Sequence, residues 1–316
     1  MRTQTEDFGK ILAALEEQEH TFSATVTYGL SGLDREKLAL FAERWHGYPV
    51  ERRRKLIQHL NEVSEANFEL DFRDINHLAL EDADSSVRQY AIEGLWEDET
   101  LALMHKLVRI ARHDPSLDVR AAAIVELGRF ILLGEYGTIS PEDARLAQDT
   151  VLHIFDHEDD NELRRRSLEA IANCGRSVVT EMIQELYAHD DLRMRMSAVF
   201  AMGRTCDEAW APEILYEMNN GQPEMQYEAA RAAGHLELQE AVPHLARLIE
   251  ETEDTEILEI AIWALGEIGG DEARKLLTSI IAQAEADSDE EIMEAAEEAL
   301  NAASLPGEFL LFDFEP

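Results

Sequence analysis

The two residues best spaced for metal chemistry are His153 and His157, which lie four apart in a segment with helical periodicity. Imidazoles one helical turn apart can bind a divalent cation, and the carboxylates of Asp156, Glu158 and Asp159 stand beside them. The pair is not part of a His-Glu-x-x-His motif, and its surroundings are strongly acidic. We therefore interpret it as a histidine pair on a helix surface or at a helix end, and we expect no metal ion.

Other motifs of catalysis are missing from the sequence. It has no glycine-rich phosphate loop, no cysteine pairs at zinc-finger spacing and no nucleophile elbow. Scattered Ser, His and Asp residues do not define a triad without a fold that brings them together. We expect no cofactor and no catalytic residues, so a non-catalytic role is the favoured interpretation.

The elements that position all side chains are indicated by a pattern that recurs seven times. It consists of an aliphatic residue, a small residue four positions on, an apolar residue eight on, and often glycine nine on. The first column is Val87, Val119, Leu163, Met194, Met225, Ile257 and Ile292. The second is Ala91, Ala123, Ser167, Ala198, Ala229, Ala261 and Ala296, and the third is Leu95, Leu127, Ile171, Met202, Ala233, Leu265 and Leu300.

Successive copies of this pattern lie 31 to 44 residues apart, which is typical of repeats built from a pair of helices. On a helix, positions zero, four and eight fall near one stripe, so the three columns are expected to face the core. The small residues allow neighbouring helices to approach closely. The pattern predicts an all-α protein, an alpha-alpha superhelix or solenoid of about eight helix pairs.

Three segments follow from this interpretation. Residues 1–71 are expected to form degenerate capping helices, residues 72–303 the repeats, and residues 304–316 an acidic-aromatic tail. Within the cap we expect helices at Thr5–His20, from Asp34 to Trp45 and after Pro49, with a turn around Gly29–Gly32. An insertion between Leu133 and Pro141 explains the 44-residue step, and its glycines are expected to end a helix.

The tail carries five large apolar residues within six positions after Pro306 and Gly307. One interpretation is that it covers the exposed end of the last repeat, because terminal repeats need shielding. The alternative is a linear motif that another chain recognises, including self-association with a second copy of this protein.

Charge restricts the class of partner. The chain has 28 Lys and Arg against 66 Asp and Glu, a net charge of −38, which opposes binding to nucleic acid or to anionic membranes. Residues 250–316 hold 20 acidic side chains and only two basic ones, Arg274 and Lys275. A basic partner is favoured, with a solvated acidic surface as the alternative. No apolar run reaches the length of a membrane span, and we expect a cytoplasmic protein.

The repeats resemble HEAT repeats, in particular the short type found in phycobilisome lyases. The resemblance is carried by segments such as Asp118-Val-Arg-Ala-Ala-Ala-Ile-Val-Glu-Leu-Gly128 and Ile257-Leu-Glu-Ile-Ala-Ile-Trp-Ala-Leu-Gly-Glu-Ile-Gly269. It implies a right-handed superhelix whose first helices are convex and whose second helices line a concave side. It also implies a ladder of Asp and Arg between neighbouring turns, for which the candidates are Asp82, Asp114, Asp159, Asp190 and Arg88, Arg120, Arg164, Arg195. In later repeats Gln226, Leu258 and Met293 replace the arginine.

One enzyme of this class, deoxyhypusine hydroxylase, binds iron through His-Glu dipeptides near the start of several second helices. The matching places here are Ala121-Ala122, Met196-Ser197, Tyr227-Glu228 and Glu259-Ile260, and none holds histidine. The resemblance to that enzyme therefore does not extend to its iron site. A tetrapyrrole (bilin) lyase or isomerase is kept as the enzyme alternative by family analogy alone.

A band of arginine and aromatic residues marks the candidate partner site. If the apolar columns face inward, other positions of the second helices face the groove, and these include residue types that are enriched at interface hot spots. The candidates are Tyr90, Arg129, Arg165, Arg166, Phe200, Arg204, Tyr227, Arg231 and Trp263. We expect a protein-interaction scaffold that binds a polypeptide segment there. A chaperone for a basic protein is a further alternative, and the arginines could instead pair with neighbouring glutamates and shield the helices.

Overall fold

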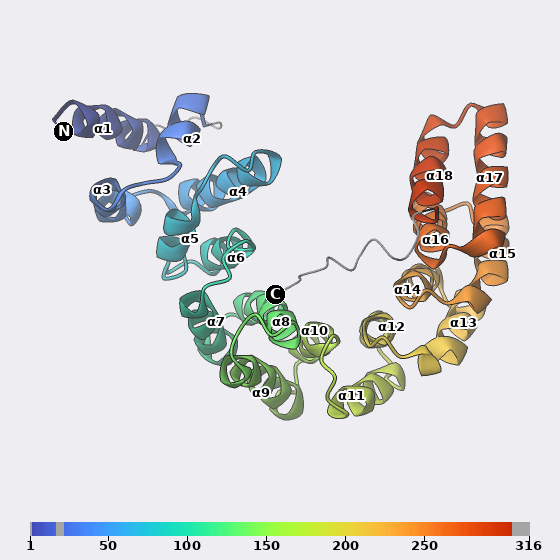
Figure 1. The fold of residues 1–316 in the computed structure, drawn as a ribbon. Coiled ribbons are helices and arrows are strands. Elements are labelled where there is room, and N and C mark those ends of the chain that lie inside the picture. The colour runs from blue at the N-terminus through green and yellow to red at the C-terminus, as the bar shows by residue number, and fades with distance from the viewer. Residues whose placement is uncertain (1, 17–21, 305–316) are drawn as a thin grey trace, which may run out of the picture. The chain divides into compact units, whose positions relative to one another are not determined.

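The computed structural model describes residues 2–16 and 22–304, and over these residues it contains helices and no strand, as predicted (Figure 1). Residues 305–316 lie outside this range, so both interpretations of the tail stay predictions. The chain forms two compact units that divide between residues 158 and 159. The division of the sequence at 71/72 and 303/304 likewise stays a prediction.

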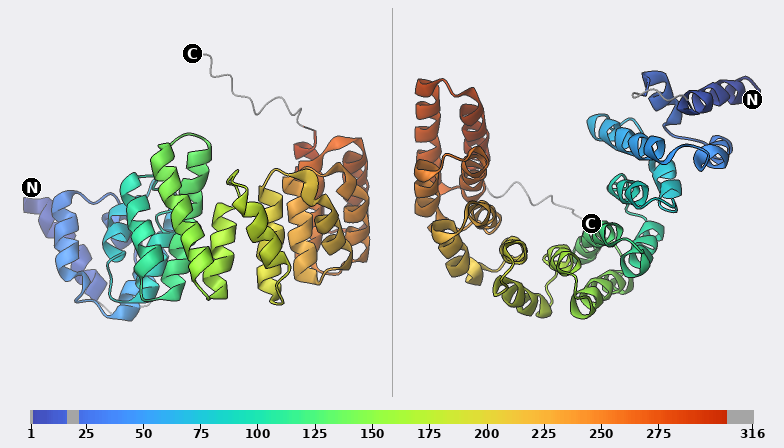
Figure 2. Two further views of the ribbon diagram at one scale, coloured as in Figure 1. Left: turned by 90° about the horizontal axis from the view of Figure 1, so that it is seen from below. Right: turned by 180° about the vertical axis from the view of Figure 1, so that it is seen from behind.

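Unit 1 holds the first nine α-helices of the described residues. Their bounds are α1 Arg2–Glu16, α2 Ala24–Leu30, α3 Arg35–Trp45, α4 Val50–Ala66, α5 Arg73–Ala79, α6 Ser85–Glu93, α7 Leu101–His113, α8 Leu117–Glu135 and α9 Pro141–His157. Helix α4 packs on α6 and α6 on α8, whereas α1 packs on α3, α3 on α5 and α7 on α9. Even-numbered helices from α4 on and odd-numbered helices therefore form two layers (Figures 1 and 2).

Unit 2 repeats this arrangement with nine further α-helices. They are α10 Asn161–Ile171, α11 Val178–Tyr187, α12 Leu192–Arg204, α13 Ala211–Asn220, α14 Pro223–His235, α15 Val242–Glu251, α16 Thr255–Ile268, α17 Gly270–Asp287 and α18 Glu290–Ala302. Short 3-10 turns at Glu208–Trp210 and Gln239–Ala241 precede α13 and α15. The even-numbered helices pack in the series α10, α12, α14, α16, α18, and the odd-numbered helices from α13 on form the second layer (Figure 2).

The columns of the repeat form the core, as predicted. Every residue of the first and second columns is buried. Residues of the third column are buried too, except Leu300 in the last pair, which is half-buried. Each second helix thus presents one apolar stripe to its neighbours, and the stripe fixes which residues are left for the opposite surface.

Aspartates three residues before the first column start most of the second helices. The side chains of Asp84, Asp160, Asp191, Asp254 and Asp289 accept hydrogen bonds from backbone N–H groups in the first turn of α6, α10, α12, α16 and α18. Such caps satisfy N–H groups that have no partner within the helix. They hold the register of the columns constant from pair to pair.

Two local features differ from the sequence predictions. Helix α2 was not expected; Ser23 caps it by accepting from the N–H of Val26, although its seven residues have no clear apolar period. Helix α8 continues through Gly134 to Glu135, and the chain turns at Gly137, where φ is +72°. The second glycine, which readily adopts positive φ, is the one that allows the turn.

The Asp–Arg ladder forms in unit 1, one rung earlier than predicted. Arg53 donates to both carboxylate oxygens of Asp82, from Nε at 2.8 Å and from Nη2 at 3.0 Å. Arg88 does the same to Asp114, and Arg120 pairs with Glu158. Glu158, not the neighbouring Asp159, is the acceptor because it stands at the same repeat position as Asp82 and Asp114, five residues before the first column.

In unit 2 the ladder changes its acceptors. Arg164 pairs with Glu185 on α11, and Arg195 donates to the carbonyl oxygens of His189 and Asp190. The carboxylates of Asp159 and Asp190, the candidates from the sequence, are not the acceptors in these bonds.

Candidate functional site

The nine predicted partner-binding residues all lie on even-numbered helices, and all are half-buried. Tyr90 on α6 and Arg129 on α8 belong to unit 1. The other seven belong to unit 2 and form the surface that we call the second-helix face: Arg165, Arg166, Phe200, Arg204, Tyr227, Arg231 and Trp263. Because each of the helices α10, α12, α14 and α16 packs on the next, these seven side chains lie on one continuous layer.

Glycines bring the helices of this layer together. A Cβ atom on Gly203 of α12 would lie 2.7 Å from the Cα of Ala232 on α14. A Cβ on Gly234 of α14 would lie 2.7 Å from Cζ3 of Trp263 and 3.1 Å from the Cα of Ala264 on α16. Only glycine permits these approaches. The glycines nine positions after the first column, Gly203 and Gly234, therefore determine how closely the neighbouring helices meet.

On α10 the two predicted arginines are neutralised within their own helix. Arg165 donates to both oxygens of Glu162 at 2.6 Å, and its Nη1 lies 3.2 Å from Glu169. Arg166 bridges the same two glutamates, at 3.0 and 2.9 Å. Burial raises the pKa of Glu162, but the hydrogen bonds from the two arginines outweigh it, so this pKa lies below its usual value. This end of the face is a balanced network of ion pairs rather than a cationic patch.

Phe200 occupies the middle of the face between two arginine head groups. The guanidinium carbons of Arg231 and Arg204 lie 4.8 and 5.5 Å from its ring centroid. Arg231 also pairs with Glu228 at 2.5 Å and lies 5.9 Å from the ring centroid of Tyr227. Burial raises the pKa of the Glu228 carboxyl above its usual value, although the charge and the hydrogen bond of Arg231 oppose this shift.

Arg204 differs from the other arginines of the face. Its Nε is buried and has no hydrogen-bond partner, and no carboxylate of the described residues lies within ion-pair distance of it. Its charge acts on His235: burial, then the charges of Arg204 and Arg231, lower the pKa of His235 to about 4. His235 is therefore neutral at neutral pH, and it packs edge-on against Trp263 with 5.1 Å between ring centroids.

Next to this stack a pocket of about 230 Å³ opens on the surface of α14 and α16. It is lined by Tyr227, Trp263, Ile260, Glu256 and Glu259. The register of the second helices predicted Tyr227, Glu259, Ile260 and Trp263 on the groove side, but not Glu256. The signal for Glu256 was present, because it is seven positions before Trp263 on the same helix.

In unit 1 the two predicted residues have local partners. Arg129 donates from Nη2 to the carbonyl oxygen of Leu95 at 3.1 Å and to Glu126 at 3.2 Å, while its Nε and Nη1 are buried without a hydrogen-bond partner. The carbonyl oxygen of Tyr90 accepts from the Asn61 side chain at 2.8 Å. Both residues belong to unit 1, whereas the other seven belong to unit 2.

The two histidines of α9 contact each other within their helix. The rings of His153 and His157 stack with 4.2 Å between centroids, and Nδ1 of His157 lies 2.9 Å from the carbonyl oxygen of His153. Over the described residues there is no group of three or more His, Cys, Asp or Glu side chains arranged to bind a metal ion. None of the helices described is both long enough and apolar enough to cross a membrane.

Comparison with known proteins supports the architecture. Residues 211–301 match the family model for HEAT repeats. Among solved structures, the complex of CpcE and CpcF of phycocyanin lyase from Nostoc sp. PCC7120 matches with a TM-score of 0.52 and 16% identity, covering 89% of this chain and 100% of that one. At this level of identity the match shows the fold alone.

Two further structures are similar at a lower level. YibA of Escherichia coli has a TM-score of 0.48 and 16% identity over 90% of this chain and 99% of its own. Yeast importin-beta (Kap95p) has a TM-score of 0.48 and 14% identity over 96% of this chain and 41% of its own. No curated protein matches the sequence significantly. The family match over residues 211–301 and the fold shared with the CpcE–CpcF complex confirm the resemblance to HEAT repeats.

Proposed function

We propose that this protein binds a polypeptide segment on the second-helix face of unit 2 and acts as a non-catalytic adaptor. The observation that carries the proposal is the partly exposed aromatic row on one layer, in which Phe200 lies between Arg204 and Arg231 and Trp263 borders a pocket with Tyr227. Rigid aromatic side chains beside arginines are the residue types that supply most of the binding energy at protein interfaces.

The arginines of the face have different roles in this proposal. Arg165, Arg166 and Arg231 already pair with glutamates of their own helices, so they shape the surface and add little net charge. Arg204 has no such partner and is the residue placed to receive a carboxylate of the bound segment. The aromatic rings of Phe200 and Trp263 would supply the apolar contact area.

The test begins with the intact chain as bait. A partner recovered on it is identified, the segment that binds is reduced to a synthetic peptide, and the affinity of that peptide is measured by calorimetry. Replacing both Phe200 and Trp263 with Ala should weaken binding by a factor of about 30 or more, because two hot-spot aromatics would be lost. Helix content should be unchanged by circular dichroism, because both side chains are half-buried rather than in the core.

Tyr216→Ala is the matched control. Tyr216 lies on α13 in the other layer and is 59% exposed, so its removal should leave the affinity unchanged. Equal affinity of the wild type and the Phe200→Ala, Trp263→Ala variant would reject the second-helix face. Tetrapyrrole absorption of the purified protein would instead support the lyase alternative. Recovery of a small basic protein that binds through its whole surface, and not through one segment, would support the chaperone alternative.

A further inference from the structure

The rungs of the ladder in unit 1 share one geometry. The acceptor stands five residues before the first column, and the arginine reaches it from the preceding helix pair. The side chains of Arg53 and Arg88 are 11% exposed, and those of their acceptors Asp82 and Asp114 are 0% and 7% exposed. The pairs Arg53–Asp82 and Arg88–Asp114 are thus nearly buried and bidentate, at the edge where two helix pairs meet. The third rung differs, because Arg120 reaches the partly exposed Glu158 from Nη2 alone.

The same two positions recur at the end of unit 2 with one partner exchanged. Leu258 directly follows Ile257 of the first column, where Arg88 and Arg120 follow Val87 and Val119. Asp287 stands five residues before Ile292, as Asp114 stands five before Val119. The three intervening acceptor positions hold no carboxylate: His189, Asn220 and Thr252. Asp287 is therefore a ladder acceptor whose arginine has been replaced by leucine.

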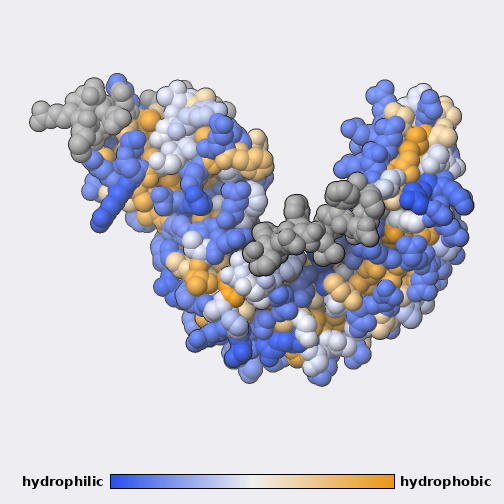
Figure 3. Space-filling model, viewed as in Figure 1, coloured by the Kyte–Doolittle hydropathy of each residue, from blue (hydrophilic) through white to orange (hydrophobic). Residues whose placement is uncertain are grey.

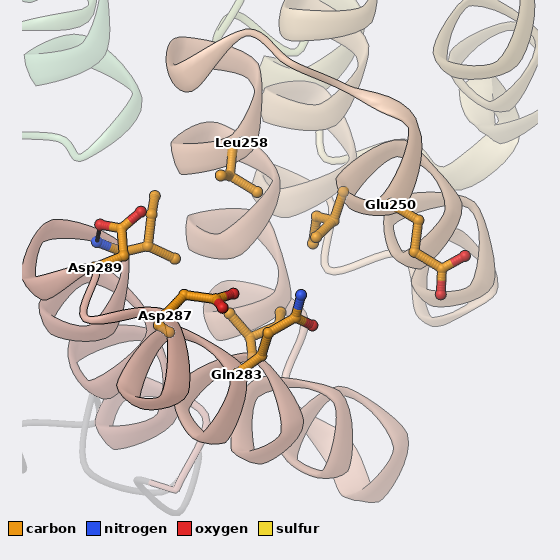
Figure 4. Close-up of a pocket in the computed structure, with 9 residues that line it drawn as sticks. Glu250, Leu258, Gln283, Asp287 and Asp289 are labelled. Carbon is orange, nitrogen blue, oxygen red and sulfur yellow. Dashed lines mark hydrogen bonds between the residues drawn. The ribbon is translucent and has the colours of Figure 1, made fainter.

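A pocket of about 330 Å³ lies at this position (Figure 4). Its apolar lining comes from four helices of the unit, α15 to α18: Ile249, Leu258, Ile280, Ala284 and Ile292. Its polar lining consists of Glu250, Gln283, Asp287 and Asp289. In Figure 4 Leu258 extends from α16 toward the side chains of Gln283 and Asp287 on α17. Figure 3 shows apolar residues between hydrophilic ones over α17 and α18.

The lining repeats the surroundings of a ladder arginine. Ile249 stands eight residues before the first column, as Ala111 does in its pair, and the carbonyl oxygen of Ala111 accepts from Nε of Arg120 at 2.8 Å. No Lys or Arg of the described residues lies within ion-pair distance of Asp287. The pocket thus has the apolar walls of a rung and a carboxylate at the rung position, although Asp287 is exposed whereas Asp82 and Asp114 are buried. The side chain of Leu258 is too short to fill the place of the arginine.

We propose that this pocket binds an arginine side chain of a polypeptide partner, which completes the ladder from outside. The guanidinium group would pair with Asp287, and the methylene groups would lie against Leu258, Ile280 and Ile292. Arginine fits better than lysine, because the rungs at Asp82 and Asp114 are bidentate and only a guanidinium offers two parallel donors. The 20 acidic residues between 250 and 316, against two basic ones, favour a cationic partner and disfavour the chain's own acidic tail.

The pocket shares no residue with the second-helix face, so the two surfaces are tested separately. The probe is N-acetyl-arginine methylamide, titrated into the intact ¹⁵N-labelled protein while backbone amide shifts are recorded. The expected result is a saturable shift at residues lining the pocket. N-acetyl-citrulline methylamide, which has the same shape without the charge, should bind more weakly, by a factor of up to about five. Equal shifts with both compounds, or none with arginine, would overturn the proposal.

Three variants locate the interaction. Asp287→Asn should weaken binding of the arginine compound to the level of the citrulline compound, and Leu258→Arg should abolish binding by forming the rung within the chain. Glu272→Gln removes an exposed carboxylate of the same helix outside the pocket and should change nothing. Undiminished binding to Asp287→Asn would reject Asp287 as the acceptor. Loss of the probe signal would leave the Phe200 and Trp263 experiment unaffected, so failure of either proposal can be recognised on its own.

Discussion

Arg88 holds both carboxylate oxygens of Asp114, with Nη2 2.7 Å from Oδ1 and Nε 2.8 Å from Oδ2. The pair joins α6 to the end of α7, the first helix of the next pair. Arg88 also donates from Nη1 to the carbonyl oxygens of Asp82 and Ala83, so one side chain ties two successive turns together. Removing one member of such a buried pair leaves the other charge without compensation, which costs more than the pair itself contributes.

The rung at Asp82 should therefore be the most sensitive to loss of charge. Its carboxylate accepts from Arg53 and from the indole N–H of Trp45 at 2.6 Å. Asp82→Asn keeps the shape but leaves the Arg53 guanidinium buried without a counter-charge, and we expect a loss of about 3–5 kcal/mol in the free energy of unfolding. Urea denaturation followed by circular dichroism measures it.

Asp71→Asn provides the control for that experiment. Asp71 pairs with Arg73, but both side chains are exposed, at 43% and 56%. The same substitution should therefore cost at most about 1 kcal/mol. Equal losses for the two variants would show that burial of the ladder does not determine its contribution.

Close packing of the second helices predicts that Gly203→Ala is destabilising. The new Cβ would meet the backbone of Ala232 at 2.7 Å, which forces α12 and α14 apart, and the expected cost is about 1–3 kcal/mol. Gly9→Ala is the control, because Gly9 also lies within a helix but has no atom within 4 Å of its added Cβ. That variant should be neutral or slightly more stable, by up to about 1 kcal/mol. Thermal denaturation of both variants measures these changes in stability. A Gly203→Ala variant more stable than the wild type would contradict the close approach of α12 and α14.

His235 should make the protein sensitive to acid. Its pKa is lowered from 6.5 to about 4 in the folded state, by burial and then by Arg204 and Arg231. Between these two values the unfolded chain binds a proton that the folded chain does not, so stability from this group is lost as the pH falls from about 6.5 toward 4. His235→Gln, which cannot be protonated, should flatten the pH dependence of urea midpoints over this range. An unchanged slope would assign the acid sensitivity to other groups.

Arg204 can be tested through the same histidine. In Arg204→Gln the pKa of His235 should rise toward 6.5, because one of the two cations that oppose its protonation has been removed. A titration of the imidazole proton shifts measures this directly. Arg193→Gln removes an exposed arginine of the same helix and should leave the titration unchanged. No shift in Arg204→Gln would mean that Arg204 does not contribute to the lowered pKa of His235.

The fold was predictable because its cause is periodic. Residues such as Val119, Ala123 and Leu127 repeat at helical spacing, and burial of each column followed from that spacing. Helix α2 was missed because its sequence Ala24–Leu30 has no apolar stripe and depends on the cap at Ser23. Local periodicity therefore predicts the repeats but not a short helix that is fixed by one side chain.

The candidate site was predictable only in part. The second-helix position of Phe200 and Trp263 followed from the register, and the pairing of Arg165 with Glu162 and Glu169 follows helical spacing of three and four residues. The partner of Arg164 did not follow, because Glu185 lies on the next helix and its approach depends on how α10 and α11 pack. Contacts within one helix can be derived from sequence spacing, whereas contacts between helices require the packed geometry.

The second-helix face has an electrical polarity along its own layer. Arg204 on α12 is uncompensated, His235 on α14 is neutral, and Glu256 and Glu259 on α16 carry negative charge beside the pocket. If the face binds a polypeptide as proposed, this polarity would favour one of the two directions in which an extended chain can lie across it. A peptide with opposite charges near its two ends would bind in one orientation. In the opposite orientation, its charged ends would lie against groups of the same sign.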